Sequence, residues 1–139
     1  MLNGFVTTNR YDRVLNLPVS FPQTNLGSGR TVIICRIPLL INQRIEIRAL
    51  AVNVVSILTP GVLPVYLNTA MQLASVGFYQ TTMLTSPLVY AAYYDQTAMT
   101  NPFAPCVVET PGTYTVIVSN NTSNVDMAVV ATGSIKFYY

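Results

Sequence analysis

The sequence contains no histidine and no tryptophan. Histidine is the commonest general base and a frequent zinc ligand, so its absence removes the Ser-His and Cys-His pairs of covalent catalysis and the usual zinc sites. The absence of tryptophan, a strong stacking side chain, counts against a dedicated sugar site. The five acidic residues lie in separate segments, and residues 27–30 lack the spacing of a phosphate-binding loop. We therefore predict no enzymatic activity and no cofactor.

Charged residues are also scarce, at 9% of the chain, against about 25% in an ordinary soluble domain. None occurs between Ala49 and Tyr94. The net charge of +2 is too small to indicate a nucleic-acid partner. Because the chain is 51% hydrophobic, we expect its surface to be covered by a membrane, by further copies of the chain or by a larger assembly.

The membrane alternative depends on residues 49–67, which have about the length of a bilayer-spanning helix. Pro60 and Pro64 interrupt this stretch, and its apolar residues alternate with a period of two, so we expect strands and no membrane partner. The first residues lack the pattern of a secretory signal, so export is not expected. The spacing of Cys35 and Cys106 suggests no metal site; two reduced, buried thiols are favoured, with a disulfide as the alternative.

Residues 43–58 show the clearest strand pattern, because residues two apart on a strand share a face. One face is almost entirely apolar and carries Ile45, Ile47, Ala49, Ala51, Asn53, Val55 and Ile57. The other begins with Arg44, Glu46 and Arg48 and continues with Leu50, Val52 and Val54. Since this second face changes from charged to apolar, we expect the strand to enter from solvent and to become covered on both sides.

Further short strands with turn residues between them are predicted along the chain. Residues 113–119 and 125–139 alternate regularly and are expected to form a hairpin through a turn at residues 120–124. Their predicted inward-facing residues include Tyr114, Val116, Val118, Val125, Met127, Val129 and Ile135. About eight short strands are typical of an antiparallel two-sheet sandwich. The predicted fold class is therefore all-β, with a jelly-roll-like topology.

Residues 1–29 show no sustained period, yet they contain many apolar side chains. We expect them to form an extended N-terminal arm that lies on a neighbouring molecule, followed by a sandwich domain over residues 30–139. The alternative is an edge strand packed on the same domain. The candidate partner contacts in the arm are Phe5, Arg10, Tyr11, Arg13, Leu15, Leu17 and Phe21.

Tyrosines form a second candidate surface, because a flat apolar ring with a hydroxyl suits both protein contacts and ligand stacking. This surface, for self-contact or for a ligand, comprises Tyr90, Tyr93, Tyr94, Tyr138 and Tyr139. For Tyr93 and Tyr94 the alternative is one ring in the core and one at its rim.

Three features together carry a resemblance: the apolar-rich arm, the charge-poor sandwich, and the run Pro-Gly-Thr-Tyr-Thr-Val-Ile-Val-Ser-Asn that leads to a strand ending in Lys136-Phe137-Tyr138-Tyr139. This layout resembles small structural proteins of tailed phages, above all capsid decoration (cement) proteins. The Gly-x-Tyr-x-Val-x-Val pattern is widespread among β-sandwiches, so no functional residue is carried over.

The resemblance implies a non-enzymatic virion structural protein, made in the host cytoplasm and located on the capsid surface. As a dimer or trimer it would bind neighbouring major capsid subunits and stabilise them, with the arm on the capsid and the uncharged middle in self-association. The alternative is a carbohydrate- or receptor-binding module of a phage tail or fibre, with Tyr90, Tyr93 and Tyr94 as its stacking surface.

Overall fold

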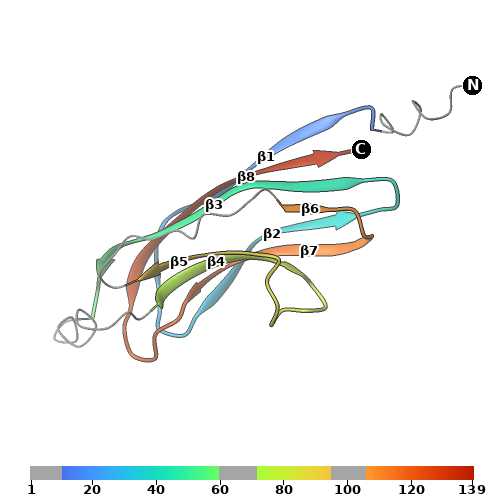
Figure 1. Ribbon diagram of the computed structural model, residues 1–139. Helices are drawn as coiled ribbons and strands as arrows, with labels where there is room; N and C mark the ends of the chain where they lie inside the picture. The colour runs from blue at the N-terminus through green and yellow to red at the C-terminus, as the bar shows by residue number, and fades with distance from the viewer. Residues whose placement is uncertain (1–10, 60–71, 95–105) are drawn as a thin grey trace, which may run out of the picture.

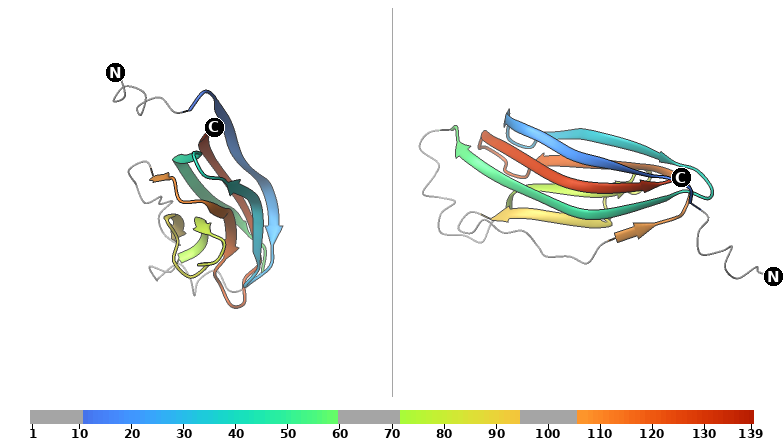
Figure 2. Two further views of the ribbon diagram at one scale, coloured as in Figure 1. Left: turned by 90° about the vertical axis from the view of Figure 1, so that its right-hand side faces the viewer. Right: turned by 90° about the horizontal axis from the view of Figure 1, so that it is seen from above.

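The computed structural model describes residues 11–59, 72–94 and 106–139, which form two antiparallel sheets of four strands each. Figure 1 shows the sheets as two facing layers, and Figure 2 shows the sandwich from one end and from above. Within these ranges there is no helix, so the predicted all-β, two-sheet antiparallel sandwich is confirmed. The strands are β1 (Val14–Leu26), β2 (Thr31–Leu39), β3 (Arg44–Ile57), β4 (Gln72–Gln80), β5 (Val89–Tyr94), β6 (Cys106–Val108), β7 (Gly112–Asn120) and β8 (Met127–Tyr138).

The order of the strands is that of a jelly roll. One sheet has the order β1-β8-β3-β6 and the other has the order β2-β7-β4-β5. Each strand of the first half therefore pairs with its counterpart counted from the end of the chain: β1 with β8, β2 with β7, β3 with β6 and β4 with β5. This is the winding of an eight-stranded jelly roll, as expected.

The hairpin predicted for residues 113–139 is wrong. β7 pairs with β2 and β4, whereas β8 pairs with β1 and β3, so residues 121–126 carry the chain from one sheet to the other. The predicted inward-facing residues of both strands are nevertheless buried, for example Tyr114 and Met127. Strands from opposite sheets face the same core, so alternation identifies the buried side of a strand without identifying its neighbour.

β3 changes its core-facing side at a β-bulge. Ile45 and Ile47 are fully buried before the bulge, and Leu50 and Val52 are buried after it. The register with β8 shifts between Ile47 and Ala49, and one extra residue moves the alternation by one position. Within one chain, the second half of this strand is therefore covered on one side only, and cover of its other side by a neighbouring subunit stays a prediction. Its outward-facing residues remain exposed, notably Ala49, Asn53 and Val55.

Gly133 of β8 makes room for this bulge. A Cβ at this position would lie 2.6 Å from the carbonyl oxygen of Ala49 and 2.8 Å from Cδ2 of Leu50. Both distances are shorter than a methyl group tolerates, and the nearer atom belongs to the backbone, which cannot rotate away. The absence of a side chain at Gly133 thus allows β3 to shift its register while it remains paired with β8.

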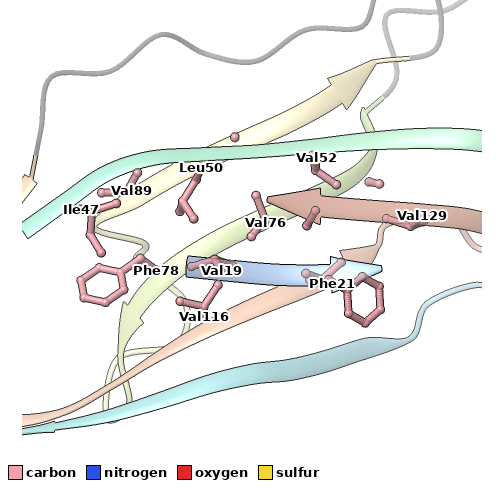
Figure 3. Packing of buried hydrophobic residues seen from close by; sticks show 14 of the residues in the cluster. Val19, Phe21, Ile47, Leu50, Val52, Val76, Phe78, Val89, Val116 and Val129 are labelled. Atoms are coloured by element: carbon pink, nitrogen blue, oxygen red, sulfur yellow. The ribbon is translucent and has the colours of Figure 1, made fainter. Parts of the chain in front are cut away.

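The hydrophobic core lies between the two sheets. Two aromatic rings, Phe78 of β4 and Tyr114 of β7, stack with their centroids 5.5 Å apart and an interplanar angle of 11°. The hydroxyl of Tyr114 donates a hydrogen bond of 2.6 Å to the carbonyl oxygen of Thr110, so this ring is buried without leaving its polar atom unpaired. Figure 3 shows the side chains that interleave from both layers, among them Val19, Phe21, Ile47, Leu50, Val76, Phe78 and Val116.

Residues 14–26 belong to the sandwich as edge strand β1. Val19 and Phe21 of this strand are buried in the core. Pro18 and Pro22 are tolerated because an edge strand leaves one row of backbone N–H groups outside the ladder. For these residues the structure shows the edge-strand alternative, and the sandwich begins well before the boundary expected at residue 30.

Candidate interaction surface

Exposed apolar side chains gather at one end of the sandwich, which we call the turn end. It carries the β2–β3, β4–β5 and β6–β7 connections and the C-terminal residue, on the right-hand side of Figure 1. Leu40 and Ile41, in the β2–β3 turn, are 63% and 75% exposed. A concentration of exposed apolar groups on one part of a small domain is typical of a contact site. The other large apolar side chains exposed at this end are Val14, Leu15, Met83, Leu84, Leu88, Val107 and Tyr139.

The β2–β3 turn holds its two apolar residues outward. Asn42 adopts a left-handed conformation with a φ of 66°, which Asn tolerates better than most residues. The backbone N–H of Gln43 donates to the carbonyl oxygen of Leu40 over 3.2 Å, and the backbone N–H of Leu40 donates to Oε1 of Gln43 over 2.9 Å. The exposure of Leu40 and Ile41 is therefore a property of an ordered turn.

The candidate arm residues divide into two groups. Arg13 and Leu15 are exposed at the turn end and are available to a partner. Phe21 is only 8% exposed and lies in the core, and Leu17 packs against the core, because both occupy inward positions of β1. The prediction that Leu17 and Phe21 contact a partner therefore needs correction. Of the three remaining candidates, Phe5 and Arg10 lie outside the described residues, and Tyr11 is described next.

Tyr11 connects the start of β1 to the opposite edge of the same sheet. Its hydroxyl donates a 2.8 Å hydrogen bond to the carboxylate of Glu109, just after β6. Its ring lies against Tyr138, with centroids 5.7 Å apart. The following backbone N–H groups of Asp12 and Arg13 both donate to the carbonyl oxygen of Tyr139, over 3.0 and 2.9 Å. Tyr11 is thus fixed at the turn end, near the apolar patch.

The tyrosines do not form the single surface expected from the sequence. Tyr93 packs against the core, while Tyr90, an odd number of residues away on β5, faces the outside of its sheet. Tyr138 and Tyr139 lie in the other sheet, at the turn end. The alternative of a core ring therefore holds for Tyr93, and the side chain of Tyr94 lies outside what the structure describes.

The outer face of β3 carries an ion-pair cluster that was not predicted from the sequence. Glu46 is only 7% exposed although it points away from the core. Its Oε1 accepts a hydrogen bond of 2.6 Å from Arg48, and its Oε2 lies 3.3 Å from a guanidinium nitrogen of Arg44. The hydroxyl of Tyr138 approaches Oε1 at 3.4 Å, and the guanidinium of Arg44 lies over the Tyr138 ring, 5.4 Å from its centroid. The spacing of Arg44, Glu46 and Arg48, two residues apart on one strand, could have predicted this cluster, since such residues share a face.

The cluster lowers the pKa of the Glu46 carboxyl group. The hydrogen bond from Arg48, helped by the charges of Arg48 and Arg44, holds the pKa of Glu46 below its usual range. Burial acts in the opposite direction and is outweighed. Glu46 is therefore ionised at neutral pH and fixes two arginines on the outer face of the sheet.

Both cysteines are free thiols and are half-buried, and burial raises the pKa of Cys35 and of Cys106. Among the residues that the structure describes, no group of three potential metal ligands lies close together. No helix in the described ranges is long and apolar enough to cross a membrane.

We compared the chain with protein-family models, with curated proteins and with solved structures. None of them matches. The functional argument therefore depends on the fold and on the surfaces of this chain alone.

Proposed function

We propose that this chain is a non-enzymatic structural protein of a virion. In this proposal it decorates the capsid surface, binds neighbouring major capsid subunits and acts as a dimer or trimer. The observation that carries the proposal is the eight-stranded jelly-roll winding combined with an apolar turn end. The jelly roll is a recurrent architecture of viral capsid domains, and the apolar patch supplies a surface for binding a shell.

The binding mechanism that we propose is burial of the turn end. Fully burying a leucine or isoleucine side chain contributes about 1.5–3 kcal/mol, so completing the burial of half-exposed residues contributes about 1 kcal/mol each. Leu40, Ile41 and Leu15 are suitable anchors because they lie on an ordered turn and on a paired strand. A modest patch repeated over many copies then stabilises a large assembly.

The carbohydrate- or receptor-binding alternative has less support. It required Tyr90, Tyr93 and Tyr94 to form one stacking surface, and Tyr90 and Tyr93 face opposite sides of β5. Jelly rolls also occur in lectin domains, so glycan binding stays a possible result of a screen. A response to Tyr93→Ala would then reflect a disturbed core, and Tyr90→Ala is the informative variant.

Two measurements test the proposal. Light scattering of the purified chain is expected to give the mass of a defined dimer or trimer, and a monomer at micromolar concentration would contradict the oligomeric part. Co-sedimentation with capsid shells should show saturable binding that the double variant Leu40→Ser, Ile41→Ser abolishes. Ile33→Ser and Leu58→Ser, two exposed apolar residues toward the opposite end, provide the matched control. If shell binding is unchanged in the Leu40→Ser, Ile41→Ser variant but is lost in the control variant, the contact lies outside the turn end.

A further inference from the structure

We propose that the outer face of the β1-β8-β3-β6 sheet binds an acidic protein surface, whose carboxylates pair with Arg44, Arg48 and Lys136. This inference rests on the proposed function, because it names the chemistry of the partner surface that the chain covers. It adds a second contact area, next to the apolar turn end.

The charges of this sheet are few and lie together. Its four strands contain three cationic residues, Arg44, Arg48 and Lys136, and one carboxylate, Glu46. In the register of the sheet, Glu46 of β3 lies directly opposite Lys136 of β8, and Arg44 lies opposite Tyr138. The cations therefore occupy neighbouring positions near the turn end. A second carboxylate, that of Glu109, lies just after β6 and accepts a hydrogen bond from Tyr11, whose ring lies against Tyr138. Two carboxylates do not neutralise three cations, so this face keeps an excess of positive charge.

The arginines are held in place before any partner arrives. Arg48 donates to Glu46 and still exposes 47% of its side chain, and the guanidinium of Arg44 lies over the Tyr138 ring while 32% of the Arg44 side chain is exposed. The Nε of Arg44 is buried and has no hydrogen-bond partner within the described part of the chain. Buried donors are normally paired. That buried Nε is out of reach of a partner, which would contact the exposed part of each side chain. A guanidinium that is already held in place is well suited to carboxylate recognition, because less side-chain entropy is lost on binding.

Electrostatics favours an acidic partner for any protein that covers this face. Covering Arg48 and Lys136 removes water from two charges, which costs free energy unless the partner supplies an opposite charge. The rest of the outer face of β3 beyond the bulge is uncharged and carries Ala49, Ala51, Asn53 and Val55. We therefore expect the partner's surface to carry one group of acidic residues beside an uncharged area.

A second copy of this chain does not fit the same face. In a symmetric pair the cluster would meet either the partner's cluster, with like charges, or the uncharged half of the partner's sheet. Neither arrangement provides an uncommitted carboxylate, since Glu46 is already bonded to both arginines and Glu109, just after β6, accepts a hydrogen bond from Tyr11. Nucleic acid fits less well, because the chain carries a net charge of only +2.

The test uses a fluorescein-labelled oligoglutamate peptide as the probe and fluorescence anisotropy at low salt as the measurement. We expect saturable binding that weakens as salt rises. Arg48→Ala and Lys136→Met are each expected to weaken binding roughly two- to fivefold, the range of one exposed ion pair. Arg30→Ala, which removes one exposed charge at the opposite end of the sandwich, is the matched control and should leave the affinity unchanged.

Lys136→Met keeps the apolar stem and breaks no ion pair recorded for the described residues, so it remains informative if Arg48→Ala disturbs Glu46. The proposal is overturned if the peptide does not bind, if Arg30→Ala weakens binding as much as the cluster variants, or if an oligodeoxythymidylate of equal charge binds more tightly. Capsid co-sedimentation separates the two proposals. Shell binding whose affinity is unchanged by Lys136→Met overturns the inference and leaves the function, whereas peptide binding without shell binding overturns the function alone.

Discussion

The Nδ2 of Asn120, at the end of β7, donates a hydrogen bond of 2.9 Å to the carbonyl oxygen of Leu26, at the end of β1. The same nitrogen donates to Val125, and Oδ1 of Asn120 accepts from the backbone N–H and the hydroxyl of Thr122. All four hydrogen-bonding positions of this buried amide are therefore used. The contact ties β1 of one sheet to β7 of the other where the chain crosses between the layers.

We predict that Asn120→Ala destabilises the fold by about 2–3 kcal/mol, because the substitution leaves buried backbone groups without their partners. Urea denaturation followed by circular dichroism measures the loss. Asn53→Ala, on the exposed face of β3, is the control and should change stability by less than about 0.5 kcal/mol. Equal effects of the two substitutions would show that the Asn120 network contributes little.

Gly133→Ala is predicted to destabilise the fold by about 1–3 kcal/mol, the usual cost of overpacking. The added methyl group would meet the carbonyl oxygen of Ala49 at 2.6 Å, so β3 or β8 must move. Gly27→Ala is the matched control, since its Cβ would lie 3.4 Å from Cγ of Arg30, at an ordinary contact distance. A thermal melt that is unchanged in Gly133→Ala would contradict the bulge geometry.

The stability of the fold should depend on pH through Glu46. Its pKa is lower in the folded chain than in the unfolded chain, where it is about 4.3. The ionised carboxylate therefore stabilises the fold above that value, and this contribution is lost as the pH falls through the folded pKa. Glu46→Gln should be less stable than the parent at neutral pH, and the difference should shrink in acid. A difference that is constant with pH would exclude the mechanism.

Two truncations separate a dispensable segment from an edge strand. Removing residues 1–10 is predicted to leave the melting temperature nearly unchanged, because β1 remains complete. Removing residues 1–20 should lower it strongly, since Leu17 and Val19 are lost together with half of the β1 ladder. Differential scanning calorimetry makes the comparison, and a folded, equally stable product of the longer truncation would contradict the role of β1.

Local patterns predicted much of the fold. Alternation identified the buried sides of β7 and β8 correctly, because it reports which side of a strand is apolar. It could not show that the two strands lie in opposite sheets, since the crossing depends on long-range pairing and on the buried Asn120. The switch of faces in β3 was visible as a pattern, but its cause lies in a bulge opposite Gly133, on a strand about 80 residues away.

The candidate site was harder to predict than the fold. The arm and its partner contacts were proposed from composition, and β1 proved to place Leu17 and Phe21 in the core. The turn-end patch is formed by residues from several connections that only the jelly-roll winding brings together. Glu46 looked like a solvated charge in the sequence, and its burial depends on Tyr138, which reaches it from β8.

The position of β8 has a consequence for how the chain folds. It is the last strand of the described chain, yet it lies in the middle of its sheet, between β1 and β3. Until β8 is in place, β1 has no neighbour in its sheet, and β3 is paired only with the three residues of β6. Pairing between strands that are far apart in the chain makes folding slow. A chain in which β8 has not yet docked therefore exposes unpaired strand edges that favour aggregation, and a chaperone would raise the yield of folded protein.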